Sequence, residues 1–513
     1  MNNTSDHHTI SQLNDFLTIQ MREKIVSLFD RFFVAGLCKA VLISGIVLYM
    51  AAIFIFKNPS CSPVEELLSL SSSPSFPALN PLGKNITGSS PTNISHLLFG
   101  LLGSEKAWHY RKAYVEAWWR PGETRGFLYL DVAPKGGLMP WSTASPPYRV
   151  SDDISAMIRE TKHVAPVMAR MVHGIMEVFR ERSPPQQEVR WVVMGDDDSV
   201  FFVDNMVDVL AAYDHTKYYY FGGQSEFVKS NYWFSFNQGF GGAGFILSYP
   251  LAAALSEGME SCLRRYARVR SADTITMLCI SDLGVNLTPL KGFHQVDLHG
   301  DLSGFLSSHP KDPLLSLHHL DMVEPIFPSM GRFDSARHLL KSAAKYDQTR
   351  MLQQTICYHR NASWTISVSW GYSVHIYEKV HPRSYLQMPI ETFKPWVAKG
   401  NMDHPLYMFN TRRPSDDPCE SPHVFFLKTA NQTAEDGIVM TYLRSSARGL
   451  PACSLNSVTG NNSADYVFRI EVYSPLTKRP QMDICECCDI MHPHGGSTLK
   501  VKYRQCVKNG IIA

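Results

Sequence analysis

Three consecutive aspartates, Asp196, Asp197 and Asp198, come directly after the apolar residues 191–195 and shortly before another apolar stretch. Like charges held a few ångströms apart raise one another's pKa or recruit a cation. A hard divalent ion accepts carboxylate ligands and keeps positions for substrate phosphates. On an extended backbone Asp196 and Asp198 point one way and Asp197 the other. The Asp-x-Asp spacing could therefore serve a metal and a sugar or water together, although a solvated turn or a helix cap is the alternative.

A glycine-rich loop, "GFGGAGF", is the second candidate, and it contains Gly241, Gly242, Ala243 and Gly244. Glycines let a backbone approach a ligand closely just before a strand begins. The alternative is that these glycines only allow the chain to bend and bind no ligand. The loop is neither a Walker loop nor a clean dinucleotide fingerprint, because no Gly-Lys-Ser/Thr follows and the glycine spacing differs.

Asp273, in "VRSADTITM", could act as a general base toward an attacking hydroxyl, or it could cap the helix that follows it. His294 and His299, in "KGFHQVDLHGD", are the nearest imidazoles in the sequence after it. A neutral imidazole binds metals well, but most lone histidines are structural or exposed.

The elements that would position these residues alternate between strands and helices. Such alternation indicates an α/β layer with a largely parallel sheet, and ligands of open α/β sheets bind outside the carboxyl ends of the strands. We expect order to begin at residues 94–108, where apolar residues recur at helical spacing, and Asp204 to cap a helix. Strands are expected at 125–134, 189–195, 217–223 and the start of 244–255, and helices at 165–182, 204–214 and the end of 244–255.

The N-terminus predicts a membrane anchor. Residues 32–56 are 25 residues with one charge, Lys39, and a bilayer core requires roughly 20 apolar residues of a helix. The long polar segment 1–31 argues against a cleaved signal peptide, and its basic residues indicate a cytoplasmic N-terminus. We therefore expect a single-pass type II protein with a lumenal body, joined by a flexible stem at 57–93 that is rich in Ser, Pro and Asn.

Sequons and cysteines agree with a lumenal body. Of the 11 cysteines, ten remain when Cys38 in the predicted anchor is set aside, and ten allow up to five disulfides. The "CECC" cluster could instead bind zinc, but no second ligand pair at zinc-finger spacing is evident. The net charge of +2 gives no indication of a nucleic-acid-binding surface. Asn-x-Ser/Thr sequons occur at Asn85, Asn93, Asn286, Asn361, Asn431 and Asn461.

The last part of the chain has a different pattern. Residues 365–380 and 466–474 alternate with period two, which is typical of strands. We expect an α/β domain at 94–327 and a disulfide-braced, mainly β region at 328–513.

Taken in order, several stretches resemble the plant Fringe-related proteins, a domain of unknown function within the Fringe and β-1,3-glycosyltransferase group. They are "VRWVVMGDDDSVFF", "FGGAGFILSYPLA", "LGVNLTPLKGFHQVDLHGDLSGFL" and "HPKDPLLSLHHLDMVEPIFP". The resemblance implies a Golgi membrane enzyme with a Rossmann-like, GT-A-type domain, which would use a UDP-sugar and Mn²⁺. It would be an inverting, β-1,3-type hexosyl- or N-acetylhexosaminyltransferase acting on a glycan or glycoprotein acceptor.

Carried over by position, the resemblance implies roles for individual residues. It makes Asp198, with Asp196 and His294, the metal ligands, and Asp273 the catalytic base. Asp196 and Asp197 would contact the donor together with the loop residues Gly241, Gly242, Ala243 and Gly244. Relatives have two consecutive acids where this chain has Ala272 and Asp273, so the alternative is a catalytically weak or inactive nucleotide-sugar-binding protein.

Overall fold

The computed structural model describes residues 91–181, 188–397, 404–433, 437–454, 462–478, 486–491 and 496–506. All of them belong to one compact unit, Leu82–Ala513. The predicted cytoplasmic tail, membrane anchor and nearly all of the stem lie outside the described residues. Within the described ranges, no helix has both the length and the apolar character needed to cross a bilayer.

A central seven-stranded sheet has the order β3-β2-β1-β4-β7-β6-β8. Every strand except β7 runs in the same direction, because β7 is antiparallel to both β4 and β6 while the other pairs are parallel. The largely parallel sheet expected from the sequence is thus confirmed. The strands are β1 (Leu97–Leu102), β2 (Arg125–Leu130), β3 (Tyr148–Val150), β4 (Trp191–Asp196), β6 (Tyr220–Gly222), β7 (Phe245–Ser248) and β8 (Leu287–Pro289).

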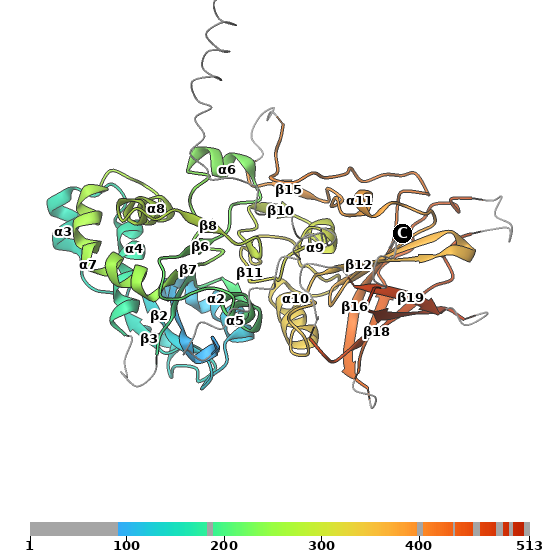
Figure 1. Ribbon diagram of the computed structural model, residues 1–513, viewed down its shortest axis with the longest axis horizontal. Coiled ribbons are helices and arrows are strands. Elements are labelled where there is room, and N and C mark those ends of the chain that lie inside the picture. Colours follow the sequence, from blue (N-terminus) through green and yellow to red (C-terminus); the bar gives the residue numbers. More distant parts are fainter. Residues whose placement is uncertain are drawn as a thin grey trace, which may run out of the picture. The chain divides into compact units, whose positions relative to one another are not determined.

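Helices cover both faces of this sheet. Successive residues of a strand point to opposite faces, and Leu97 and Phe99 of β1 join one apolar core while Leu98 joins another. On one face lie α2 (Glu105–Trp118) and α5 (Val203–Leu210), and on the other α4 (Pro166–Arg180), α7 (Tyr249–Arg265) and α8 (Ala272–Asp282). Figure 1 shows α3 (Ser155–Thr161) grouped with this second set of helices.

Two local predictions were wrong. Residues 94–108 do not form one helix: the run Leu97–Leu102 is β1, whose central place in the sheet buries every residue, and α2 begins only after Ser104, whose hydroxyl caps it. Asp204 does not cap α5, because the N-cap is Phe202. Asp204 instead lies in the first turn, where its carboxylate forms an ion pair with Arg120 at 2.6 Å.

A small three-stranded sheet lies beside the carboxyl end of β4. It has the order β5-β11-β9 and consists of β5 (Val200–Phe201), β11 (Ser316–Leu317) and β9 (Phe293–His294). Strand β5 is antiparallel to β11, and β11 is parallel to β9. This sheet brings the residues after β4 next to residues more than a hundred positions later in the chain.

The C-terminal half forms an eight-stranded sheet in the order β12-β13-β14-β16-β17-β18-β20-β19. The strands predicted at 365–380 and 466–474 are confirmed as β13, β14 and β18. Figure 1 shows β12, β16, β18 and β19 at the end of the unit opposite α3 and α7. The strands are β12 (Gln354–His359), β13 (Trp364–Ser369), β14 (Ser373–Tyr377), β16 (His423–Gln432), β17 (Gly437–Arg444), β18 (Arg469–Pro475), β19 (Cys487–Met491) and β20 (Thr498–Arg504).

Short elements link the two sheets. Strand β10 (Leu298–Gly300) pairs with β15 (Phe393–Pro395), so a strand of the predicted α/β domain pairs with one beyond its predicted end. Helices α6 (Val228–Trp233), α9 (Ser303–Ser308), α10 (Arg332–His338) and α11 (Arg383–Leu386) complete the unit. The boundary near residue 327 stays a prediction.

Four disulfides form among the described cysteines. Cys357–Cys488, Cys419–Cys453 and Cys487–Cys506 brace the C-terminal sheet, as expected, and Cys262–Cys279 joins α7 to α8. Cys487 and Cys488 are therefore not free for zinc, and Cys485 lies outside the described residues. The sequon asparagines at 93, 286, 361 and 431 are all exposed.

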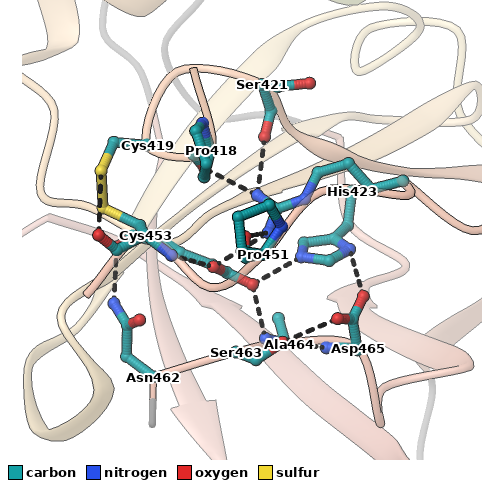
Figure 2. A network of polar contacts seen from close by, with 12 residues as sticks. Pro418, Cys419, Ser421, His423, Pro451, Cys453, Asn462, Ser463, Ala464 and Asp465 are labelled. Carbon is teal, nitrogen blue, oxygen red and sulfur yellow. Dashed lines mark hydrogen bonds and ion pairs between the residues drawn. A yellow bond between two sulfur atoms is a disulfide. The ribbon is translucent and has the colours of Figure 1, made fainter. Parts of the chain in front are cut away.

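A buried ionic network fixes the loops next to β14. The carboxylate of Glu378 is fully buried and accepts hydrogen bonds from His423 Nε2 (2.7 Å), Arg448 (3.0 Å) and the backbone N–H groups of Cys453 and Ala464 (both 2.8 Å). Figure 2 shows His423, Cys453 and Ala464 within this network of polar contacts. Burial alone would raise the pKa of Glu378, but these hydrogen bonds and the Arg448 charge lower it to about 2.

Candidate functional site

The three aspartates lie at the end of β4 and in the turn to β5. Asp196 is the last residue of β4, and its backbone N–H donates to Ser199 Oγ at 2.7 Å, which closes the turn. Asp196 and Asp198 lie close to the same histidine, whereas Asp197 accepts hydrogen bonds from Arg111 (2.7 Å) and from the backbone N–H of Ser104 (3.3 Å). This is the alternation expected from an extended backbone.

Arg111, from α2, is the principal cation facing the aspartates. Its guanidinium forms ion pairs with Asp197 (2.7 Å), Asp198 (3.1 Å) and Asp321 (3.1 Å), and only 24% of the side chain is exposed. Nearby carboxylates favour the charged guanidinium and raise its pKa even though burial opposes this. Arg111 is not among the residues that the sequence pattern predicts.

His318 is the histidine next to the aspartates. Its Nε2 atom lies 3.1 Å from Asp198 Oδ1, because the pairing of Leu317 with Val200 places the residue after β11 beside the residues before β5. One ligand atom each from Asp196, Asp198 and His318 lie within 4.8 Å of one another, as a metal site requires. The sequence analysis does not predict His318 as a site residue, although His318 directly follows the short strand Ser316–Leu317 in "SLHHLDM".

The pKa values of this group show an excess of negative charge. Burial, followed by the neighbouring carboxylates, raises the pKa of Asp196 to about 7 although His318 opposes the shift. Burial and the Asp198 charge likewise raise the pKa of Asp197 to about 6. Burial would lower the pKa of His318, but Asp198 raises it to about 9, and His318 with Arg111 keeps the pKa of Asp198 below its usual range despite burial. Two cations, Arg111 and protonated His318, thus face four carboxylates, those of the three aspartates and Asp321.

His294, the ligand implied by the resemblance, lies on β9 and is buried. Its Nδ1 atom is 3.1 Å from Glu226 Oε1. Among the described residues, the group that could hold a metal at the aspartates consists of Asp196, Asp198 and His318 and does not include His294.

The glycine-rich loop packs directly against this group. Ser199 Oγ donates to the carbonyl oxygen of Gly242 (2.6 Å), and Gln295 Oε1 accepts from the N–H of Ala243 (2.8 Å). A Cβ atom at position 242 would lie 2.1 Å from the His318 ring, and Gly244 has a φ of +90°. Glycine is therefore required at both positions, by close approach at one and by backbone conformation at the other.

Asp273 lies across the loop from the aspartates, in the first turn of α8. The N-cap of α8 is Ser271 and not Asp273, so the capping alternative for Asp273 is not borne out. Its Oδ1 atom accepts a hydrogen bond from the N–H of Gly241 at 3.1 Å. Burial raises the pKa of Asp273 to about 6, although this hydrogen bond opposes the shift. Asp196, Gly241, Ala272 and Asp273 line one small cavity, so the structure brings the two predicted carboxylate sites together.

Comparison with known proteins agrees with this geometry. Residues 230–488, just over half of the chain, match the family described as "Protein of unknown function, DUF604", and residues 151–305 match the family described as "Fringe-like". A Homo sapiens protein named beta-1,3-glucosyltransferase is 28% identical over 127 residues, which are 24% of this chain and 23% of that protein. The chain thus aligns with less than a quarter of that relative. The chain belongs to the DUF604 family, and its place in the Fringe and β-1,3-glycosyltransferase group is confirmed.

Proposed function

We propose that this protein is an inverting glycosyltransferase that moves a sugar from a UDP-sugar to a hydroxyl of a glycan or glycoconjugate. One observation carries the proposal: at the carboxyl edge of the sheet, one glycine loop contacts both the group Asp196–Asp198–His318, through Gly242, and Asp273, through the N–H of Gly241. Asp196 and Asp273 also line one cavity of about 20 Å³. The Fringe-like match and the beta-1,3-glucosyltransferase relative support it. A GT-A-type fold, β-1,3 specificity and a lumenal Golgi location on a type II anchor are parts of the same proposal.

The residues present fit a divalent cation such as Mn²⁺. Carboxylate oxygens suit this ion. His318 would ligate it after losing its proton, because metal binding displaces protons from its ligands. His318 Nδ1 is a buried atom with no hydrogen-bond partner within the described part of the chain. Asp196, Asp198 and His318 would hold the ion. Asp197, tied to Arg111, would keep the turn in place and contribute to the donor site. When bound, such an ion stabilises charge that develops on a departing diphosphate.

Asp273 would serve as the general base. The acceptor oxygen attacks the anomeric carbon of the donor sugar, the bond from that carbon to UDP breaks with its electron pair leaving on UDP, and Asp273 takes the hydroxyl proton. A base works best when its pKa lies near the operating pH, and burial gives Asp273 a pKa of about 6. Gly241 is the one residue of Gly241–Gly244 that is only half-buried, so the donor would meet the loop there.

Ala272 favours a second candidate, a nucleotide-sugar-binding protein with little or no turnover. Its side chain lines the same cavity as Asp273, and it stands where the resemblance implies an acid. Under this alternative the chain binds a UDP-sugar with Mn²⁺ but transfers slowly, and Ala272→Asp raises the rate.

The test uses the full chain with a panel of UDP-sugars and Mn²⁺, and it measures donor binding, hydrolysis and transfer. Asp198→Ala should weaken donor binding and lower turnover together, the latter by roughly 100-fold or more. Asp273→Asn should keep binding and lose roughly 100-fold or more in turnover. Asp416→Ala, at an exposed position, is the matched control. If the wild-type chain binds no UDP-sugar in the presence of Mn²⁺, the proposed function is wrong.

A further inference from the structure

A second cavity, of about 570 Å³, lies beside the candidate site, and two distant parts of the chain line it. One wall comes from residues after β6 and around β9, and the other from residues 384–389 and 408–410 of the C-terminal half. Asp196, Asp198, His318 and Asp273 are not among its lining residues. Its volume falls in the range of about 300–1,000 Å³ that is usual for ligand pockets.

The cavity and the aspartate group share structural elements. Strands β4, β6 and β8 run in the same direction, so the residues that follow them lie at one edge of the sheet. His294, which lines the cavity, pairs with Leu317, the residue directly before His318. The N–H of Phe240 donates to Gly223 O (3.0 Å), so the glycine loop starts at the cavity wall. The cavity wall at Gly223 therefore adjoins the start of the glycine loop, and the N–H of Gly241 in that loop donates to Asp273.

The two walls are joined rigidly by hydrogen bonds. Glu226 accepts from the N–H of Val296 through its side chain (2.6 Å) and from the N–H of Met408 through its backbone carbonyl (2.9 Å). Val228 N–H donates to Leu406 O at 3.0 Å. The C-terminal segment is thus fixed in place before any ligand arrives, which lowers the entropic cost of binding.

The lining side chains combine amide, cationic and apolar groups. Gln387 and Asn410 carry amides, which both donate and accept hydrogen bonds, and Lys291 and Lys311 are exposed donors on the opposite wall. None of these four side chains has a hydrogen-bond or ion-pair partner inside the ranges that the structure describes. Phe409 adds a half-buried aromatic ring. Sugar rings present hydroxyls that donate and accept together with apolar C–H faces, so this combination suits a carbohydrate.

We propose that this cavity binds the acceptor oligosaccharide, so that residues 384–389 and 408–410 of the C-terminal half determine acceptor specificity. This inference rests on the proposed function, because an acceptor subsite has meaning only beside a donor site. It also gives the C-terminal half a role in the reaction: it supplies one wall of the acceptor site. Gln387 and Asn410 are positioned for hydroxyl recognition, and Phe409 for contact with a sugar ring.

The experiment measures binding of the full chain to an array of defined oligosaccharides and, separately, Mn²⁺-dependent binding of UDP. Gln387→Ala and Asn410→Ala should each weaken binding to the preferred oligosaccharide by roughly three- to tenfold, the effect of one lost hydrogen bond. Ser384→Trp, at an exposed lining position, should abolish glycan binding by filling the cavity. UDP binding should not change in any of the three. Gln432→Ala, an exposed amide at the end of β16, is the matched control.

Each other outcome is decisive. If oligosaccharide binding is present but insensitive to all three cavity variants while UDP binds, the acceptor inference is overturned and the proposed function stands. If the wild-type chain binds UDP and no oligosaccharide of the array, the inference is overturned as well. If oligosaccharides bind through the cavity but UDP does not bind, the proposed function fails, and the cavity is a carbohydrate site of another kind. Unchanged thermal unfolding of Ser384→Trp shows that its effect is local.

Discussion

His318 Nε2 lies 3.1 Å from Asp198 Oδ1, although 120 residues separate the two in the chain. The contact depends on the short antiparallel pairing of β5 with β11. It completes a cluster in which two carboxylates and an imidazole face one another, while Arg111 forms ion pairs with both Asp197 and Asp198. This arrangement can hold a divalent ion, and it lies next to Asp273, the residue best placed to act as a base.

Replacing Arg111 by glutamine should destabilise the fold. The change leaves the carboxylates of Asp197, Asp198 and Asp321 without their shared cation, and removing one partner of a buried ion pair costs about 3–5 kcal/mol. Urea unfolding measures the loss. Mn²⁺ should restore part of the stability of this variant, because the ion would supply positive charge at the same group. Arg413→Gln, at an exposed position, is the control. Unchanged stability of Arg111→Gln would show that the aspartates do not need this cation.

The activity should depend on pH through Asp273. Burial raises the pKa of this carboxyl to about 6, and only its ionised form can accept a proton. The rate should therefore rise with pH up to and just beyond about 6 and then level off. The measurement is kcat/KM against pH for the wild type, with Asp273→Asn as the comparison. The variant should lose the acidic limb together with most of the rate. If the rate of Asp273→Asn still fell at low pH as the wild-type rate does, the pH dependence would belong to a group other than Asp273.

Glu378→Gln should destabilise the C-terminal sheet by about 3–5 kcal/mol, because it removes the buried charge that His423 and Arg448 contact. The pKa of Glu378 is about 2 in the folded chain against an ordinary 4.5. The unfolded chain thus binds more protons between these values, and the wild type loses this stability as the pH falls from about 4.5 toward 2. Chemical unfolding at several pH values measures both effects, and Glu257→Gln, at an exposed position, is the control. Equal pH dependence of wild type and Glu378→Gln would contradict the role of this network.

The sequence predicts the parts of this site whose signal is local. The apolar run before Asp196 and the alternating pattern of 365–380 identify strands directly, because each depends only on neighbouring residues. The glycine loop and Asp273 can also be predicted from the sequence, because short stretches of neighbouring residues are enough to show the family resemblance there. Residues 94–108 are misread because a strand buried on both faces is apolar throughout, and periodicity then carries no information.

Arg111 and His318 could not be predicted because they join the site through long-range contacts. Arg111 is one of several basic residues in α2, and only the packing of α2 beside the β4–β5 turn selects it. His318 follows a two-residue strand whose partner lies more than a hundred residues earlier. The disulfide partners are similarly long-range: Cys357 and Cys488 are 131 residues apart, and ten cysteines allow many pairings.

The central claim is that Asp196, Asp198 and His318 form a metal site that serves a nucleotide-sugar donor. The most direct measurement is a calorimetric titration with Mn²⁺ in the presence of UDP. It compares the full-length wild type with His318→Gln and His294→Gln. His109→Gln, on the exposed side of α2, controls for the loss of an imidazole. We predict that His318→Gln loses Mn²⁺ binding while His294→Gln and His109→Gln retain it. Mn²⁺ binding by His318→Gln equal to that of the wild type would contradict the claim.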